Sequence, residues 1–200
     1  IDTLGYPYCR GRVFDHVETD EGQYNDVCEV FWAAGACMFV RASAYKKLNG
    51  LDEDFFAHME EIDLCWRLNR GGYLVYYNGH STVYHLGAGT LSYNHPRKIF
   101  LNFKNGLAML LKNLTGGELL YKIPMRILLD WVAATSFLLK GQFSNFVAVF
   151  KAHISLMGDL KQVWRKRKAL LAEYPVYTRK AIHPNLVVVD YYLKGKKKIH

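Results

Sequence analysis

One stretch of the chain decides how the rest is interpreted: Asp54-Phe55-Phe56-Ala57-His58-Met59-Glu60-Glu61-Ile62-Asp63-Leu64-Cys65-Trp66-Arg67. Apolar residues recur in it at three- and four-residue spacing, which predicts a helix over 55–69 that Gly71-Gly72 ends. Three carboxylates fall near the start of this helix. Glu60 and Asp63 share one face of it, whereas Glu61 points roughly 100° away.

Two interpretations of these acids follow from the residues alone. Carboxylates near a helix amino terminus are favourable because of the helix dipole, and Asp63 can pair with Arg67 one turn later, so the group can be purely structural. Alternatively, a carboxylate beside Phe55 and Phe56 is partly desolvated, which is one way for a general base to acquire a useful pKa. Composition alone favours the structural interpretation.

Strand signals lie on both sides of the acidic stretch. Upstream, the apolar run Glu29–Arg41 contains Ala33-Ala34-Gly35-Ala36, which predicts a buried strand pair with a side-chain-poor bend. Downstream, composition predicts strands over 73–77 and 82–85, and the loop Gly87-Ala88-Gly89-Thr90 follows. A short helix is expected at 43–48.

The second half of the chain is helical in pattern. One amphipathic helix is expected over 99–112, ending near Asn113 and Gly116-Gly117, and apolar-rich stretches follow at 118–139 and 143–164. The longest nearly uncharged piece, 127–139, is shorter than the roughly 20 residues that a bilayer span needs. It is therefore either a core helix or one that lies in the membrane interface.

Composition and charge exclude several classes. The 200 residues are 50% hydrophobic, 22% charged and 14% aromatic, which excludes a disordered chain, and the net charge is +8. The excess positive charge lies in residues 151–200, with 12 Lys and Arg against 3 Asp and Glu, which argues against a basic body wrapped in nucleic acid. The four cysteines form no C-x-x-C pair, so a structural zinc site is not expected; reduced thiols are, although an even number leaves a disulfide open.

The stretch 161–168 concentrates the basic charge, with five cations beside Trp164. A basic amphipathic stretch of this kind is typical of binding to an anionic membrane surface, where Trp lies at headgroup depth. A solvated helix face is the alternative. Nucleic acid is not expected as a partner, because no recognised RNA or DNA module accompanies the charge.

Five motifs in order carry a resemblance to a known family. They are Trp32–Arg41, Asn49–Phe56, Glu60–Arg67, Gly72-Tyr73 and Val83–Thr90. Together they resemble the C-terminal half of a family 2 glycosyltransferase, and in particular the rhamnosyltransferase-like enzymes of bacterial surface-polysaccharide assembly. The resemblance covers roughly residues 5–125.

The resemblance implies an α/β fold of the GT-A type. Residues 1–97 would form the C-terminal, acceptor-side half of that domain, and 98–200 a helical extension with a basic tail. The nucleotide-sugar-binding βαβ unit would precede residue 1, so we expect a fragment of a longer enzyme that is inactive in isolation. The implied reaction is inverting transfer from a nucleotide-sugar to a carbohydrate or polyprenyl-linked acceptor in cell-surface polysaccharide synthesis.

The resemblance also implies catalytic roles. Glu60 and Glu61 match the family's acid pair, and Glu61 takes the position of the base that deprotonates the acceptor hydroxyl. The family usually has Asp there, one methylene shorter, so the two glutamates are kept together as the pair. His85 matches a ligand of Mg²⁺ or Mn²⁺, shared with an acid in the missing half. Without the resemblance, His85 reads as a strand-end histidine bonded to backbone.

Five further residues are assigned to the substrate-binding side. Gly35 and Ala36 form the bend that lets the acceptor sugar approach, and Trp32 is either a stacking platform for a sugar ring or a core aromatic. Asp63 and Arg67 are expected to support the acidic helix there.

The expected location is cytoplasmic, peripheral at the inner face of the cell membrane. A second hypothesis is a non-catalytic peripheral membrane or carbohydrate-binding module, in which the acids are merely capping residues.

Overall fold

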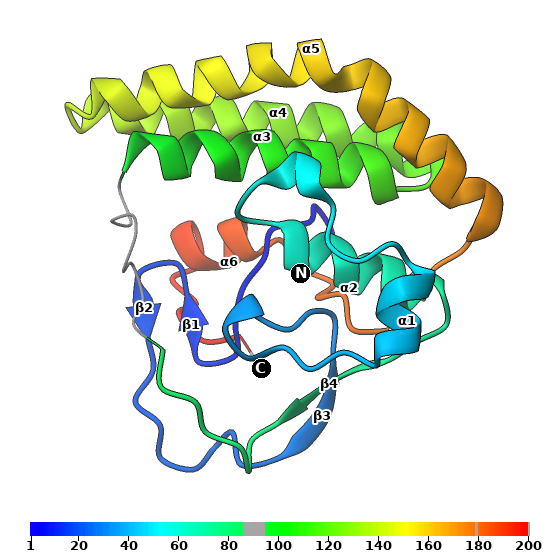
Figure 1. The fold of residues 1–200 in the computed structure, drawn as a ribbon. Helices are drawn as coiled ribbons and strands as arrows, with labels where there is room; N and C mark the ends of the chain where they lie inside the picture. The colour runs from blue at the N-terminus through cyan, green and yellow to red at the C-terminus, as the bar shows by residue number, and fades with distance from the viewer. Residues whose placement is uncertain (86–94, 179, 200) are drawn as a thin grey trace.

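The computed structural model describes residues 1–85, 95–178 and 180–199 and combines helices with short strands (Figure 1). The predicted motif Val83–Thr90 and its glycine loop lie largely outside these residues. The elements in chain order are β1 (Arg12–Val13), β2 (His16–Val17), β3 (Val27–Val30), η1 (Gly35–Cys37), α1 (Ala42–Lys47), η2 (Glu53–Phe55), α2 (Glu60–Arg70), β4 (Val75–Asn78), α3 (Pro96–Asn113), α4 (Gly116–Leu139), α5 (Phe143–Glu173) and α6 (Val187–Tyr192).

The described strands form two antiparallel pairs. β1 pairs with β2, and β3 pairs with β4 in a register that sets Val27 opposite Asn78 and Val30 opposite Val75. The strand predicted over 73–77 is present as β4. The strand predicted over 82–85 is wrong, because Val83 and Tyr84 are exposed and no described strand pairs with them. The apolar run 29–41 forms a strand only at its first end and then turns through η1.

Helices α3, α4 and α5 lie together on one side of the molecule, above the strands and α2 (Figure 1). α3 ends at Asn113 as predicted. The glycine pair after it begins α4 instead of only separating the helices, because Thr115 and Glu118 form a capping box at that point. Within the described residues, no helix has the length and apolar character needed to cross a membrane.

The main hydrophobic core is built around Trp66 of α2. The Trp66 ring packs edge-on against Phe31, with 5.4 Å between centroids, and shares a buried cluster with Phe55. Met109 and Leu110 of α3 belong to the same cluster. Residues on both sides of the boundary expected at 97 therefore share one core, because α2 is amphipathic and its apolar face is covered by α3.

The C-terminal segment returns to the start of the chain. The backbone N–H of Val187 donates to the buried Asp2 carboxylate at 3.0 Å, and that of His183 donates to the Ile1 carbonyl at 2.9 Å. Val13, Val187 and Ile199 form a small buried cluster. The end of the basic segment is thus packed against the N-terminal part of the fold.

Candidate active site

The turn before α2 has a backbone that residues other than glycine rarely adopt. Phe56, His58 and Met59 have φ angles of 59°, 69° and 75°. Each such conformation costs on the order of 1 kcal/mol, and the surrounding structure must hold it. The residues that precede the acidic pair therefore lower the stability of the folded state.

Asn105 of α3 holds this turn. Its side-chain amide donates to the carbonyl oxygens of Phe55, Ala57 and His58 at 2.8, 2.9 and 2.9 Å. Asn105 itself is 2% exposed. Because these bonds replace water at buried carbonyl groups, they fix the amino end of α2 relative to α3.

Glu60 and Glu61 stand together at the first turn of α2, and both are half-buried. Burial and the neighbouring Glu60 carboxylate raise the pKa of Glu61 above the usual value for glutamate, although a hydrogen bond with the Gly35 backbone opposes the rise. Within the described part of the chain, one buried oxygen of each carboxylate, Oε2, has no hydrogen-bond partner. The pair thus has acceptor capacity that the described fold does not use.

The small-residue bend lies against this acidic pair, because the Gly35 backbone is hydrogen-bonded to Glu61. The backbone of Ala33 is also hydrogen-bonded to the Cys65 thiol, whose pKa burial raises to about 11. All four cysteines are free thiols, and the raised pKa keeps Cys65 protonated and inert at neutral pH.

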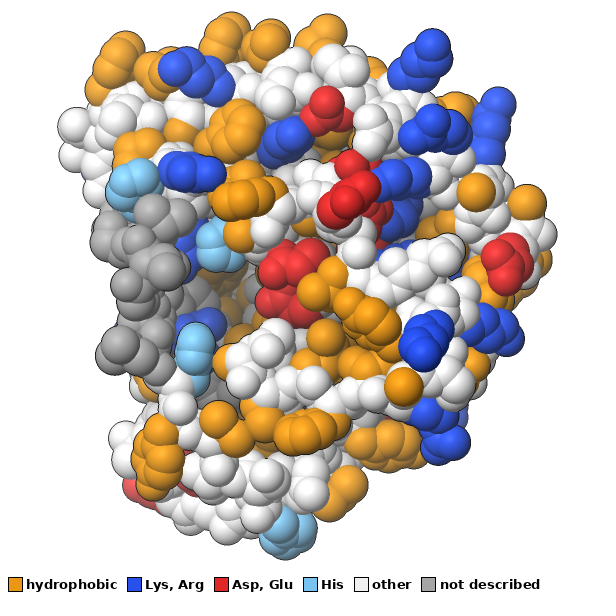
Figure 2. Space-filling model, viewed as in Figure 1, with side chains coloured by type: hydrophobic (Ala, Val, Ile, Leu, Met, Phe, Trp, Pro, Cys, Tyr) orange, Lys and Arg blue, Asp and Glu red, His pale blue; other side chains and the backbone are white. Residues whose placement is uncertain are grey.

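An open cavity of about 1210 Å³ adjoins the bend. Among the predicted site residues, Trp32, Ala36 and His85 line it. Glu60, Glu61 and Gly35 are not lining residues, although Ala34 and Ala36 on either side of Gly35 are, and Glu61 is hydrogen-bonded to the Gly35 backbone. In the space-filling view, acidic side chains gather beside a hollow where α2 begins (Figure 2).

Trp32 packs against the core, as one of its two predicted roles requires, and it also lines the cavity. Its ring packs against the main core, and its Nε1 donates to the Tyr8 carbonyl at 3.2 Å. Core packing and this hydrogen bond fix the position of the indole, which also lines the cavity. Trp32 is therefore a fixed part of the cavity wall.

Asp63 and Arg67 lie behind the acidic pair. Asp63 is fully buried and accepts from Arg67 Nε, Lys112 Nζ and Asn113 Nδ2, each at 2.8 Å. Arg67 also donates to the Gly50 carbonyl at 2.7 Å. The charged atoms of both residues are taken up by protein contacts, so they support the acidic helix and do not reach a substrate.

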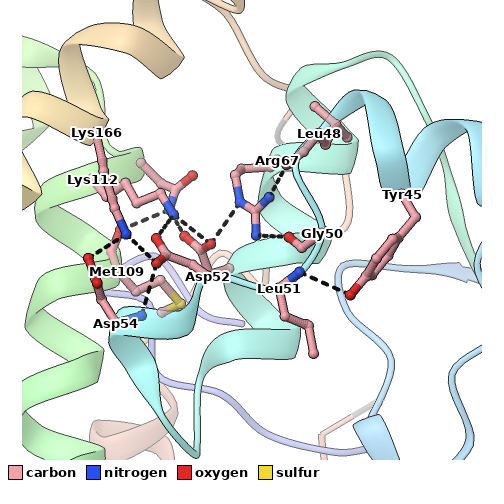
Figure 3. A network of polar contacts seen from close by, with 12 residues as sticks. Tyr45, Leu48, Gly50, Leu51, Asp52, Asp54, Arg67, Met109, Lys112 and Lys166 are labelled. Carbon is pink, nitrogen blue, oxygen red and sulfur yellow. Dashed lines mark hydrogen bonds and ion pairs between the residues drawn. The ribbon is translucent and has the colours of Figure 1, made fainter.

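A second charged cluster joins α5 to the turn that precedes α2 (Figure 3). Asp52 accepts from Lys112 at 2.6 Å and from Lys166 at 2.5 Å, and Lys166 also pairs with Asp54. Burial alone would raise the pKa of Asp52, but the two ammonium groups lower it to about 2. The carboxylates of Asp52 and Asp54 are thus both taken up by ion pairs within the fold.

The predicted metal ligand His85 is exposed. Across residues 1–85, 95–178 and 180–199, no group of three or more His, Cys, Asp or Glu side chains could hold a metal ion. One imidazole does not make a site, so the described residues alone do not fit a bound Mg²⁺ or Mn²⁺. His58 and His80 lie in the turn before α2 and at an exposed position after β4.

The contribution of α3 to the site was not predicted from the sequence. Asn105, Lys112 and Asn113 supply the polar contacts that hold the acidic turn and α2. A signal for them was present: they occupy the same face of the predicted helix as Leu101 and Met109, which are buried. Polar residues on an otherwise apolar face require buried partners.

Comparison with known proteins gives relatives of one kind. The chain is similar to curated rhamnosyltransferases. It is 27% identical over 144 residues to the N-acetylglucosaminyl-diphospho-decaprenol L-rhamnosyltransferase of Mycobacterium tuberculosis, an alignment that covers 72% of this chain and 41% of the relative. It is 42% identical over 57 residues to rhamnosyltransferase WbbL of Escherichia coli K12, covering 28% of this chain and 21% of the relative.

These matches span less than half the length of each relative. No family model matches the chain. No solved structure matches it.

Proposed function

We propose that this chain is the acceptor-side part of an inverting family 2 glycosyltransferase with a GT-A fold. It would transfer a sugar, rhamnose by its likeness to the relatives, from a nucleotide-sugar to a carbohydrate or lipid-linked acceptor in cell-surface polysaccharide synthesis. The observation that carries this proposal is the acidic pair Glu60-Glu61, half-buried with unused acceptor oxygens beside a bend without bulky side chains.

In the proposed reaction Glu61 is the general base. Its carboxylate accepts the proton of the acceptor hydroxyl while that oxygen attacks the anomeric carbon. The bond from this carbon to the nucleoside diphosphate breaks, and the configuration inverts. The raised pKa of Glu61 makes its carboxylate a stronger proton acceptor than a solvated glutamate, and Glu60 contributes to that rise through its charge.

The acceptor sugar is proposed to enter the cavity beside Gly35 and Ala36. Neither residue has a side chain larger than a methyl group, so a pyranose ring can come close to the backbone there. Trp32, fixed in the same cavity wall, offers an apolar ring face against which a sugar can pack.

A divalent metal remains part of the proposal only through His85. Mg²⁺ or Mn²⁺ would neutralise the leaving diphosphate, and His85 would be one of its ligands, together with an acid outside this chain. The open position of His85 in the cavity wall supports this role, but no step of the mechanism above depends on it.

The proposed partners are a nucleotide-sugar, a polyprenyl-linked or carbohydrate acceptor, and an anionic membrane surface, without nucleic acid. The M. tuberculosis relative is named for a decaprenol-linked acceptor, and a lipid-linked acceptor would bring the enzyme to a membrane. We accordingly place the protein in the cytoplasm, peripheral at the inner face of the cell membrane.

The decisive experiment replaces the base in the full-length protein. Glu61→Gln keeps the shape of the side chain but cannot take a proton, so we expect the rate of sugar transfer to fall roughly 10²–10⁴-fold with an unchanged far-ultraviolet circular dichroism spectrum. The matched control is Glu53→Gln, an exposed glutamate of the preceding turn, which should transfer at the wild-type rate.

A second variant tests the tuning of the base. Glu60→Gln removes a negative charge next to Glu61, so the pKa of Glu61 falls and the acidic limb of the rate profile moves to lower pH. Unchanged transfer by the Glu61→Gln variant would contradict the catalytic assignment and favour a non-catalytic carbohydrate-binding or membrane module.

A further inference from the structure

Helix α4 buries charges where a water-facing helix buries apolar side chains. Glu118, Lys122, Arg126 and Asp130 follow one another at four-residue spacing and are 4%, 7%, 4% and 0% exposed. They form two ion pairs along the helix, Lys122 with Glu118 at 2.8 Å and Arg126 with Asp130 at 3.0 Å. The polar stripe of α4 thus faces the protein.

The opposite stripe of α4 is apolar and exposed. Leu120 and Leu139 are 81% and 83% exposed, and Leu128 and Val132 are each 59% exposed. An amphipathic helix at a protein–water boundary shows the reverse order, with its apolar stripe on the core. This inversion indicates that the outer side of α4 meets an apolar medium.

Helix α5 continues the same surface. Phe143, Phe150, Ile154 and Met157 are exposed and recur at helical spacing on one face. The half-buried Trp131 ring of α4 lies 6.2 Å from the exposed Phe150 ring, centroid to centroid, so the two helices are in contact beside the exposed stripe of α5. We call this surface the α4–α5 apolar face; its members are Leu120, Tyr121, Leu128, Val132, Leu138, Leu139, Phe143, Phe150, Ile154 and Met157.

The same stripe of α5 becomes basic towards its carboxyl end. After Met157 its positions are filled by Lys161, Arg165 and Lys168, all exposed, with Trp164 beside them. In Figure 2, hydrophobic side chains stand along the upper edge over α5, and Lys and Arg side chains gather towards the end where α5 descends.

Only three of the five cations expected in 161–168 face outward. Lys166 is paired with Asp52 and Asp54, and Arg167 is buried, donating to the carbonyl oxygens of Leu111 and Leu114. The basic stretch is therefore divided between the fold and the surface, and the surface part is continuous with the α4–α5 apolar face.

We propose that the α4–α5 apolar face lies flat in the headgroup region of an anionic lipid bilayer, with Lys161, Arg165 and Lys168 on the lipid phosphates. This deepens the peripheral attachment proposed above by naming the surface that makes it. Two helices with apolar outer stripes can immerse those stripes about 5–10 Å without crossing the bilayer. Lipid is favoured over a second copy because the cations border the apolar stripe, as an anionic surface with an apolar interior requires.

The test is vesicle co-sedimentation of the full-length protein without any sugar substrate, so its outcome is separate from that of the transfer assay. Vesicles of phosphatidylglycerol with phosphatidylcholine should bind the wild type. Raising the ionic strength should weaken this binding, because salt screens the attraction between the cations and the lipid phosphates. Replacing Leu120, Leu128 and Val132 with Gln should weaken partitioning on the order of 100-fold, because three side chains no longer enter the apolar layer.

A second variant isolates the charges. Replacing Lys161, Arg165 and Lys168 with Gln should weaken binding to anionic vesicles by on the order of fivefold per charge and abolish the preference for anionic over neutral vesicles. The matched control replaces Val17 and Leu193, which are 67% and 81% exposed but lie away from α4 and α5, and it should bind as the wild type does.

Two results would overturn the inference. One is equal vesicle binding by the wild type and the Leu120, Leu128 and Val132 variant, with thermal melting showing that both are folded. The other is a stable dimer of the wild type in analytical ultracentrifugation that the same variant loses while vesicles bind neither, which would make the face a subunit interface.

Discussion

Removing the Asn105 side chain should loosen the acidic pair from its support. Asn105→Ala deletes the amide that donates to the carbonyl oxygens of Phe55, Ala57 and His58, and it leaves at least one buried carbonyl without a partner. Each lost bond costs about 1 kcal/mol, and an orphaned buried acceptor costs about 1–3 kcal/mol. We expect the free energy of unfolding in urea to fall by about 2–4 kcal/mol.

Asn105→Ala should also slow sugar transfer. The turn from Phe56 to Met59 holds unfavourable positive φ angles, and without Asn105 it can relax towards ordinary backbone conformations. Backbone amides in the first turn of α2 should then exchange with deuterium faster, and sugar transfer should slow through kcat. Asn105→Asp, which has the same shape but lacks the amide donor, should behave like the alanine variant.

The matched control is Asn102→Ala, one turn earlier on α3 and only partly buried. It should change the free energy of unfolding by about 0.5 kcal/mol or less. If Asn105→Ala were no more destabilising than this control, and exchange in α2 were unchanged, the turn would be held by other contacts and the reasoning would be refuted.

Two further predictions concern the carboxylates behind the site. Asp63→Asn leaves Arg67 buried without its counter-charge and leaves Lys112 with Asp52 alone, so unfolding in urea should become easier by about 3–5 kcal/mol; wild-type stability in that variant would show that the pairs of Asp63 contribute nothing. Asp52 has its folded-state pKa lowered from 3.8 to about 2, so its contribution to stability is complete above pH 3.8 and is lost as the pH falls towards 2. Urea titrations between pH 2 and 5 should show a smaller loss for Asp52→Asn than for the wild type, because the variant retains Glu118, whose pKa is likewise lowered to about 2.

Local patterns in the sequence predicted most of the helices. The repeat of apolar residues through Trp66 gave a helix there because one face of α2 packs on the core, and the helix ending at Asn113 followed from the same rule. The strand over 82–85 failed for the opposite reason. Its composition favours a strand, but a strand needs a partner and a covered face, and Tyr84 is 97% exposed.

The site was predictable only in part. Gly35 and Glu61 are in contact. Gly35 could be singled out by the side-chain-poor run around it, and Glu60 and Glu61 only through the family resemblance, because composition alone favours a structural role for them. The role of Asn105 could not, because it depends on a contact between residues that are 47–50 positions apart in the chain. The division of the five cations in 161–168 between fold and surface could not be predicted for a similar reason: Lys166 and Arg167 have partners on other elements, which periodicity does not reveal.

Lys166 gives helix α5 a mechanical role. The helix has 31 residues, about 46 Å of stiff rod, and it is pinned near its carboxyl end to Asp52 and Asp54, only a few positions ahead of Glu60. A rod fastened in this way transmits rotation, because bending a helix breaks its own hydrogen bonds. A rotation of the outer half of α5 is therefore passed on to the Lys166 ion pairs. The orientation of Glu60 and Glu61 thus depends on what contacts the far end of α5.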